Sequence, residues 1–269
     1  MDELAIEFDV LLPVYNAADT LLRTLESIFD QAYLPTNLII IINGCSDASE
    51  KIADKFTLDN RVNIVKVVFA ENVGLVGALN AGLNECTSLW VARIDADDYW
   101  LSDHLLNLRN GILKGDVNLG LIAGSASIMK DDKLVACSPV LDDAGIRKFL
   151  VNDNPFVHSA VAFKLSVIET VGPYNLNSIF EDYDLWIRIL AKYKGEIISS
   201  QMCVHIRSSQ SLTAGYRLVD SLKERLKLQY TALRLVSNFT VNGVFRILVT
   251  CVRWFFYKII LAIFPKEKL

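Results

Sequence analysis

Uninterrupted apolar runs alternate with segments of mixed polarity through the first 95 residues of the chain. The run NLIIIIN at 37–43 is aliphatic between its two asparagines, which is typical of a strand covered on both faces. In 17–31, Leu21, Leu25 and Ile28 recur at helical spacing and predict an amphipathic helix. By these patterns, strands are expected at 8–14, 37–43, 61–69 and 88–94, with helices at 17–31, 46–56 and 74–86. Such alternation predicts an α/β fold with a Rossmann-like, mostly parallel sheet flanked by helices.

Two polar clusters directly follow predicted strands. Asn43 and Gly44 end the second strand, and the segment DADD at 95–98 comes after the fourth. In a parallel sheet, ligands bind beyond the carboxyl ends of the strands. We therefore expect both clusters to border one crevice.

The pattern changes after about residue 115 and becomes mixed, with short strands, loops and one clear helix at 181–193 (EDYDLWIRILAKY). The segment 208–215 has the Ser-rich composition of a linker, and the chain beyond it is helical in pattern, basic and apolar. The sequence therefore predicts a main domain at 1–210, with a first half at 1–114 and a mixed half at 115–210, and a C-terminal region of amphipathic helices at 211–269.

Charge is unevenly distributed along the chain. Residues 217–269 carry ten Lys or Arg against three Asp or Glu, whereas the first 216 residues carry 17 against 28. An acidic body with a basic, apolar end argues against nucleic acid as a partner and for a membrane surface. Five scattered cysteines without a Cys-x-x-Cys spacing indicate a reducing compartment, and residues 1–10 lack the features of a secretory signal. A cytoplasmic protein is therefore expected.

The carboxylates Asp95, Asp97 and Asp98 are candidate ligands for a hard divalent cation. Mg²⁺ or Mn²⁺ bound by one or two carboxylates keeps positions open for substrate phosphates. Such a cation would neutralise a diphosphate and stabilise the charge that builds on it as it leaves. The alternative is a solvated acidic turn, because Asp is common after strands.

Five sequence blocks carry the most specific pattern in the chain. They are DVLLPVYNAADTLLRTLESIFDQAY at 9–33, ENVGLVGALNAGLNE at 71–85, VARIDADD at 91–98, NPFVHSAVAFKLSVIETVGPYN at 154–175 and EDYDLWIRIL at 181–190. In this order and spacing they resemble the family 2 glycosyltransferases, which are inverting enzymes with a GT-A fold that use nucleotide-diphospho-sugars. The resemblance covers about residues 7–210. It implies that the first half binds the nucleotide-sugar and the mixed half binds the acceptor.

The resemblance implies roles for the acidic residues. In DADD, Asp97 or Asp98 would be the direct ligand of Mn²⁺ or Mg²⁺, and Asp95 would help to orient the donor. Asp182 matches the family's catalytic base, with Glu181 as an acceptor contact or neighbour. Inversion in one displacement needs a base close to the acceptor hydroxyl and opposite the leaving group. The alternative is that acidic residues in a first helical turn only complement the helix macrodipole.

Four further residues are candidates for contacts to the acceptor or the diphosphate. His158 matches the family's histidine between the donor and acceptor regions, although a histidine among apolar residues is also a structural hydrogen-bonder. Trp186 either walls the acceptor cleft or belongs to the core. His205 and Arg207, in VHIR, show the residue types of the family's Tyr-Arg-x-His in exchanged order, and a cation there could face the diphosphate.

The resemblance places the donor pocket near the ends of the first strands. Its expected members are Pro13, Tyr15, Asn16, Asn43, Asn72, Gly74 and Asn80, together with Asp95 and Asp97. Asn43 departs from the family, where an aspartate commonly accepts a hydrogen bond from uracil N3–H. An asparagine oxygen accepts the same bond without charge assistance, so UDP is the expected carrier. The alternative is that Asn43 and Gly44 only shape a turn.

The most apolar stretch of the chain lies at 241–265. Its polar residues recur along one helix face and are Asn242, Arg246, Thr250, Arg253 and Tyr257. A spanning helix would bury an arginine at about 2.5–3.5 kcal/mol, whereas a helix in the interface leaves this face at the headgroups. We therefore expect peripheral attachment to the cytoplasmic face of a membrane and an acceptor carried on a lipid. The alternative is a hairpin packed on the catalytic domain or at a dimer interface.

The leading hypothesis is an inverting, metal-dependent glycosyltransferase that moves a sugar from a UDP-linked donor to a hydroxyl of a glycan or lipid-linked acceptor in polysaccharide or lipopolysaccharide biosynthesis. A nucleotidylyltransferase would carry a Gly-rich basic loop after the first strand, which LLPVYNAADT at 11–20 lacks. A catalytically degenerate, membrane-bound partner in a polysaccharide assembly complex is the non-enzymatic alternative. The sugar, acceptor, linkage and oligomeric state are left open by the sequence, and an oligomer is compatible with it.

Overall fold

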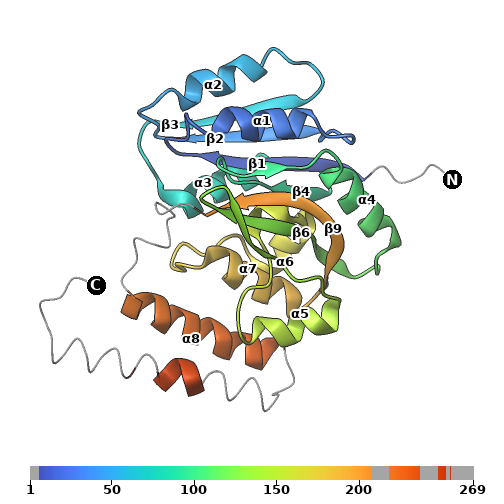
Figure 1. The fold of residues 1–269 in the computed structure, drawn as a ribbon, viewed down its shortest axis with the longest axis vertical. Coiled ribbons are helices and arrows are strands. Elements are labelled where there is room, and N and C mark those ends of the chain that lie inside the picture. Colours follow the sequence, from blue (N-terminus) through green and yellow to red (C-terminus); the bar gives the residue numbers. More distant parts are fainter. Residues whose placement is uncertain (1–5, 208–217, 237–247, 253–254, 256–269) are drawn as a thin grey trace, which may run out of the picture.

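A computed structural model describes residues 6–207, 218–236, 248–252 and 255. Within these residues it forms one nine-stranded sheet in the order β3-β2-β1-β4-β8-β6-β9-β5, and β7 pairs with β6 outside this path (Figure 1). The strands are β1 (Phe8–Val14), β2 (Asn37–Asn43), β3 (Asn63–Phe69), β4 (Trp90–Arg93), β5 (Tyr99–Trp100), β6 (Leu119–Lys130), β7 (Lys133–Cys137), β8 (Val161–Lys164) and β9 (Lys194–Ile206). The helices are α1 (Leu21–Phe29), α2 (Ser49–Phe56), α3 (Gly74–Leu83), α4 (His104–Lys114), α5 (Asp143–Leu150), α6 (Leu165–Val171), α7 (Glu181–Leu190) and α8 (Leu218–Leu235), with one 3₁₀ turn, η1 (His158–Ala160).

The first half of the sheet is parallel. β1 lies between β2 and β4, and β3 extends the sheet beyond β2. Helices α1, α2 and α3 connect these strands in chain order, with β1, β2 and β3 preceding them respectively. The predicted α/β architecture is confirmed, and the carboxyl ends of β1, β2 and β4 meet at one edge.

The second half of the sheet is mixed, as the sequence predicted. β8 runs antiparallel to both β4 and β6, β9 runs parallel to β6, and the short β5 runs antiparallel to β9. Because β4 and β8 are directly paired, the sheet continues from one half into the other without a break. The predicted halves, 1–114 and 115–210, therefore contribute strands to one continuous sheet.

Each face of the sheet carries its own hydrophobic core. Along β2, Leu38, Ile40 and Ile42 face one core, to which α1, α2 and α4 contribute, whereas Ile39 and Ile41 face the other. The second core takes side chains from α3, α5, α6, α7 and α8. This two-sided burial explains why β2 is an unbroken apolar run.

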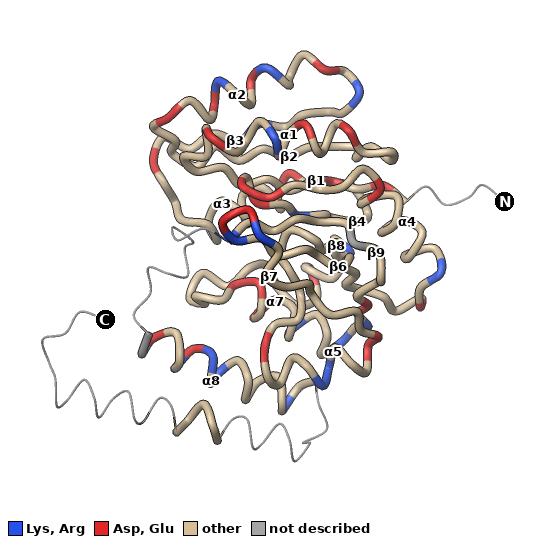
Figure 2. The backbone as a smooth tube through the Cα atoms, in the orientation of Figure 1, with Lys and Arg blue, Asp and Glu red and all other residues tan. Residues whose placement is uncertain are grey.

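Helix α8 packs against α5 and α7, at the end of the molecule opposite β3 (Figure 1). Its apolar residues Leu228 and Ala232, and Val236 just beyond it, are buried in the second core, and the helix also carries two acidic and four basic residues (Figure 2). This first helix of the C-terminal region therefore belongs to the folded body of the chain.

The remainder of the C-terminal region is described only in part. The predicted linker at 208–215 lies outside the described residues, as does most of the apolar run at 241–265, of which 248–252 are helical. Within the described ranges, the structure contains no helix that is long and apolar enough to cross a membrane.

Candidate active site

The three carboxylates predicted to bind a cation lie together beyond the end of β4. Asp95, Asp97 and Asp98 each place one carboxylate oxygen within 4.8 Å of the others. Asp98 is fully buried, where it accepts a hydrogen bond from the Ile206 backbone N–H at 2.8 Å and faces His205 Nδ1 at 3.0 Å. The loop thus meets the end of β9, which closes the site from the acceptor half.

Helix α1 holds the backbone of this acidic loop. The hydroxyls of Thr20 and Thr24 donate to the Ala96 carbonyl at 2.8 and 3.0 Å, and the Thr24 hydroxyl also lies 2.7 Å from the Asp98 carbonyl. Arg23 Nη2 donates to the Asp97 carbonyl at 2.9 Å. These contacts go to the backbone of the loop and not to its carboxylates, and the sequence analysis missed all three residues, Thr20 at the N-cap of α1 and Arg23 and Thr24 within it.

The three aspartates differ in their electrostatic surroundings. Burial alone would raise the pKa of Asp95, but the charge and hydrogen bond of the buried Arg93 outweigh it and lower the pKa to about 2. Burial, with the neighbouring charges of Asp95 and Asp98, raises the pKa of Asp97 to about 6. In the described part of the chain, the Asp97 carboxylate has no hydrogen-bond or ion-pair partner.

This donor set fits a hard divalent cation. Three carboxylates provide oxygen ligands, and the unpartnered Asp97 sits in a negative field that a cation would relieve. Asp98 is already held by His205 and Ile206, and Asp95 by Arg93. Of the two predicted ligands, Asp97 is therefore the more available one.

The Glu181–Asp182 pair begins α7 and faces the same site. Asp182 Oδ1 accepts from the Tyr183 backbone N–H and Oδ2 from Asn154 Nδ2, both at 2.7 Å. Burial raises the pKa of Asp182, and the charges of Arg93 and Asp95 also act on that pKa, so the pair and the acidic loop share one electrostatic environment. Burial and the charge of Asp182 raise the pKa of Glu181 as well.

The macrodipole alternative applies to a different residue of α7. Asp184, in the same first turn, pairs with Arg188 at 2.8 Å on the helix surface. The pKa of Asp182, by contrast, is influenced by the charge of Asp95 in the acidic loop. The pair at the start of α7 therefore differs from ordinary acidic residues of a first turn.

His158 lies between the two acidic groups. Its Nε2 is 2.9 Å from the Tyr174 hydroxyl, and its Nδ1 is 4.0 Å from Glu181 Oε1. Burial lowers the pKa of His158 well below its ordinary value, so the ring is neutral. Trp186 is fully buried and packs against the edge of this ring, together with Phe156 and Phe163. Helical periodicity puts the Trp186 indole in the core, and its role as a wall of the acceptor cleft stays a prediction.

Two asparagines predicted to touch the donor have structural partners instead. Asn43 is buried, accepts from the Val73 backbone N–H at 2.9 Å and donates to Asn72 Oδ1 at 3.0 Å. Asn80 pairs with the Tyr174 backbone through both halves of its amide, at 2.9 and 3.0 Å. These contacts show that Asn43 shapes the turn and that Asn80 ties α3 to the loop that carries Tyr174, and the predicted donor contacts of both stay predictions.

The other predicted donor residues surround this turn. Asn72 Oδ1 accepts from the Gly74 N–H at 2.7 Å, and Gly74 begins α3 with a φ of 78°. Pro13 is buried within β1, and Asn16, with a φ of 47°, accepts from the Ser46 N–H at 2.8 Å.

Two side chains at the site's rim are more exposed. Tyr15, just beyond β1, is 51% exposed, so its ring is open to a ligand. Arg207 is exposed just after β9, two residues beyond His205. His205 itself is committed to Asp98, so of the VHIR pair only Arg207 is open to a diphosphate.

Comparison with known proteins agrees with this geometry. The sequence model of Glycosyl transferase family 2 matches residues 9–137. The O-antigen biosynthesis glycosyltransferase WbnJ of Escherichia coli is 30% identical over 231 residues, covering 80% of this chain and 85% of WbnJ. This chain belongs to glycosyl transferase family 2. The predicted membership is thereby confirmed.

Other family 2 relatives cover nearly the whole chain. The UDP-Gal:alpha-D-GlcNAc-diphosphoundecaprenol beta-1,3-galactosyltransferase of Escherichia coli is 29% identical, covering 94% of this chain and 95% of the relative. Among solved structures, S. aureus TarS 1-349 in complex with UDP-GlcNAc superposes with a TM-score of 0.73 at 14% identity, covering 98% of this chain and 76% of TarS. At that identity, the superposition shows the GT-A fold and no more.

Several site residues of this family 2 chain were missed by the sequence analysis. Arg93 is buried beside Asp95, and Ser159 accepts from the Asp95 N–H at 3.0 Å. Asn154 touches Asp182, and Tyr174 touches His158. All four lie inside the sequence blocks that resemble the family, so the blocks marked the right segments. Only the folded chain shows which side chains in those segments contact the acidic residues of the site.

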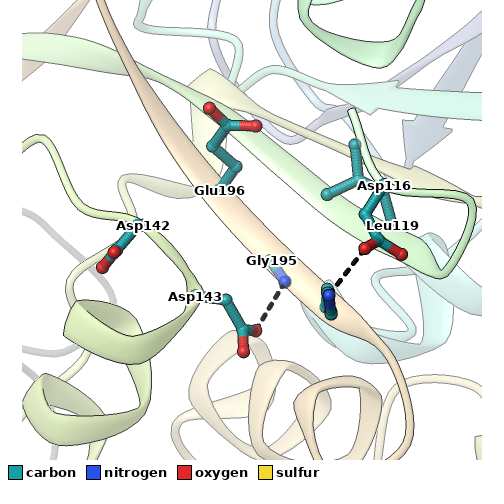
Figure 3. Close-up of a pocket in the computed structure, with 7 residues that line it drawn as sticks. Asp116, Leu119, Asp142, Asp143, Gly195 and Glu196 are labelled. Atoms are coloured by element: carbon teal, nitrogen blue, oxygen red, sulfur yellow. Dashed lines mark hydrogen bonds and ion pairs between the residues drawn. The ribbon is translucent and has the colours of Figure 1, made fainter. Parts of the chain in front are cut away.

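A pocket of about 150 Å³ lies elsewhere, between α5, the start of β9 and the segment before β6 (Figure 3). Three of the four carboxylates that line it, all but Glu196, have structural partners. Asp142 caps α5, Asp143 accepts from the Gly195 N–H at 3.0 Å, and Asp116 pairs with Lys194 at 2.6 Å (Figure 3). We therefore assign the chemistry to the acidic loop and α7.

Proposed function

We propose that this family 2 chain is an inverting sugar transferase that uses a UDP-linked donor and a lipid-linked glycan acceptor, in the assembly of a bacterial polysaccharide or lipopolysaccharide. The observation that carries the proposal is the unpartnered Asp97, in a cluster of three carboxylates that shares its electrostatic environment with Asp182. The galactosyltransferase relative, whose name gives UDP-Gal as donor and a GlcNAc-diphosphoundecaprenol as acceptor, supports the substrate classes. Asn43 gives no support for UDP, because its amide serves a turn.

Mn²⁺ or Mg²⁺ would be held by Asp97 and Asp98 and, when bound, would neutralise the diphosphate of the leaving nucleotide. Arg93 keeps Asp95 ionised in a buried setting, so that Asp95 can orient the donor as an acceptor of hydrogen bonds. Tyr15 and Arg207, both exposed at the rim, are the proposed contacts to the nucleotide and the diphosphate.

Asp182 is the proposed base. As the acceptor oxygen bonds to the sugar's anomeric carbon, the bond from that carbon to the diphosphate oxygen breaks, and the hydroxyl proton passes to the Asp182 carboxylate. The two N–H donors on Asp182 favour its ionised form, which opposes the effect of burial on its pKa. Glu181 and the neutral His158 line the same side and are proposed acceptor contacts.

A degenerate, non-catalytic family member would not need this arrangement. The charges of Arg93 and Asp95 act on the pKa of both Glu181 and Asp182, which supports an enzyme. The test is to incubate purified protein and Mn²⁺ with a panel of nucleotide-sugars and a GlcNAc-diphospholipid acceptor, and to measure released nucleotide. Metal-dependent release with a UDP-sugar is expected, and its loss in the Asp97→Asn/Asp98→Asn double variant. Release that is equal with and without the metal would contradict the proposal.

We also propose that the chain attaches peripherally to the cytoplasmic face of a membrane through residues beyond α8. Removing 237–269 keeps α8 whole, including the buried Val236. The truncated protein is expected to leave the membrane fraction on cell lysis, and unchanged partitioning would count against this attachment.

A further inference from the structure

The proposed base is held by a residue outside its own helix. Asn154 Nδ2 donates to Asp182 Oδ2 at 2.7 Å, while the Tyr183 backbone N–H donates to Oδ1 at the same distance. Each carboxylate oxygen therefore receives one N–H and keeps a lone pair for the proton that it would accept. Of these two donors, only Asn154 can be changed by substitution.

The orientation of the Asn154 amide is fixed by its neighbours. Its Oδ1 accepts from the Phe156 backbone N–H at 3.1 Å, so Nδ2 is the half that faces Asp182. Its own backbone N–H donates to Asp153 Oδ1 at 2.9 Å. The loop 152–154 begins from the end of α5, where the Asn152 and Asp153 N–H groups donate to the Phe149 carbonyl at 2.8 and 3.0 Å.

Helix α8 also contacts this loop, through one hydrogen bond and one ion pair. Gln229, which is buried, donates through Nε2 to the Asn152 carbonyl at 2.7 Å, and Arg225 forms an ion pair with Asp153. These two contacts come from adjacent turns of α8, on the face that packs against α5 and α7. The loop is thus anchored on both sides of the residue that touches the base.

The same helix also reaches the segment that leads into α7. The Ser178 hydroxyl lies 3.4 Å from Glu224 Oε1, and the Phe180 N–H lies 3.4 Å from the Ser178 hydroxyl. Phe180 directly precedes Glu181, where α7 begins. Helix α8 therefore contacts both the loop 152–154, which carries Asn154, and the segment 178–180, which leads into α7 and Asp182.

We propose that Asn154 is a positioning residue for the base Asp182, and that α8 is part of the catalytic body because it holds the loop that carries Asn154. This inference rests on the proposed function, since it takes Asp182 as the base. It gives the first helix of the C-terminal region a role in sugar transfer that is separate from membrane attachment.

Loss of the Asn154 amide would act on both geometry and charge. Without it, the Asp182 carboxylate can rotate, and a misplacement of about 1 Å costs up to about 100-fold in rate. The ionised form also loses a donor, so the pKa of Asp182 rises further. The charged and titratable groups that face Asp182 are Arg93, Asp95, Tyr174, Glu181 and Tyr183, and all of them remain in place.

The first test compares Asn154→Ala and Asn154→Asp with the wild-type protein in the transfer assay. We expect kcat to fall by up to about 100-fold, with the donor KM unchanged. The acidic limb of the kcat/KM profile should move to higher pH, and further for Asn154→Asp, because it places a like charge beside the base. A merely structural role would not move this limb. If both variants instead lose donor binding in calorimetry, Asn154 supports the whole domain and the inference is overturned.

The second test concerns α8. The Arg225→Ala/Gln229→Leu variant should lower kcat in the same direction as Asn154→Ala but by less, with the donor KM unchanged. Lys223→Ala is the matched control, because Lys223 is an exposed cation two residues from Arg225 on the same helix. Equal kcat in the double variant and the control would overturn the role of α8.

Asp182→Asn separates this inference from the proposed function. If that variant turns over normally, the base assignment fails and the inference fails with it. If Asp182→Asn is inactive while Asn154→Ala keeps the wild-type kcat and pH profile, the base stands and only the inference is overturned.

Discussion

The donor side and the base side of the site are built in different ways. The acidic loop is a continuous stretch, 95–98, at the end of one strand, and its carboxylates converge because the chain turns once. The base side draws on residues from 154 to 229 that meet only in the folded chain. A continuous motif can therefore be recognised from spacing, whereas an assembled one needs coordinates.

Arg93 joins the two sides. It is buried, pairs with Asp95, and its charge also acts on the pKa values of Glu181 and Asp182. A buried cation between two acidic groups lowers the cost of bringing them together. This comparison leads to three kinds of variant: those on the donor side or the base side, those at Arg93 between them, and those at residues on neither side.

The largest effect is expected on the base side. Asp182→Asn should lower transfer by about 10²–10⁴-fold, because the base is lost, while donor binding stays near wild type. The rate of nucleotide release measures transfer, and calorimetry with UDP measures donor binding. Asp184→Asn is the matched control, since Asp184 pairs with Arg188 in the same helix turn and should retain turnover. Equal losses in both variants would mean that the effect is structural.

The second prediction concerns Arg93, which lies between the donor side and the base side. Arg93→Met removes the buried partner of Asp95, whose side chain is 32% exposed, and should lower the free energy of unfolding by about 1.5–3 kcal/mol, measured by denaturant titration. Arg61→Met breaks an exposed pair with Asp59 and should change stability little. If the two variants are equally stable, Arg93 does not join the two sides as described.

A third prediction concerns pH and a residue on neither side. His104 is fully buried, stacks on Trp100 at 4.3 Å, and burial lowers its pKa to about 3. The unfolded chain takes up this proton below about pH 6.5 and the folded one does not, so stability falls as pH decreases from there toward 3. His104→Phe should remove about 2 kcal/mol of this loss between pH 7 and 5. Parallel stability curves for the variant and the wild type would contradict the prediction.

The smallest effect separates structural from donor-binding residues on the donor side. Asn80→Ala removes two hydrogen bonds to the Tyr174 backbone and should cost about 1–3 kcal/mol of stability, with the donor KM unchanged. Tyr15→Ala, at an exposed ring, should instead raise the donor KM and leave the unfolding midpoint unchanged. If Asn80→Ala instead raised the donor KM and kept the wild-type stability, Asn80 would be a donor-binding residue.

These contrasts also show what could be predicted from the sequence. Apolar periodicity gave the parallel half, because β2 is buried on both faces and α1 on one. The position after a strand pointed to the acidic loop, and the family resemblance pointed to the start of α7. The sequence could not assign Asn43 or Asn80, because an asparagine near a strand end suits a ligand and a turn equally, and only partner atoms decide. Nor could it reveal Asn154, whose partner lies 28 residues away.

The central claim is that the acidic loop holds a cation for the donor while Asp182 serves only the acceptor. Titration calorimetry of UDP with and without Mn²⁺, on wild type, Asp97→Asn and Asp182→Asn, tests it most directly. We predict that Mn²⁺ strengthens UDP binding in the wild type and in Asp182→Asn, but not in Asp97→Asn. Binding that ignores Mn²⁺ in the wild type, or a metal effect that survives in Asp97→Asn, would contradict the account.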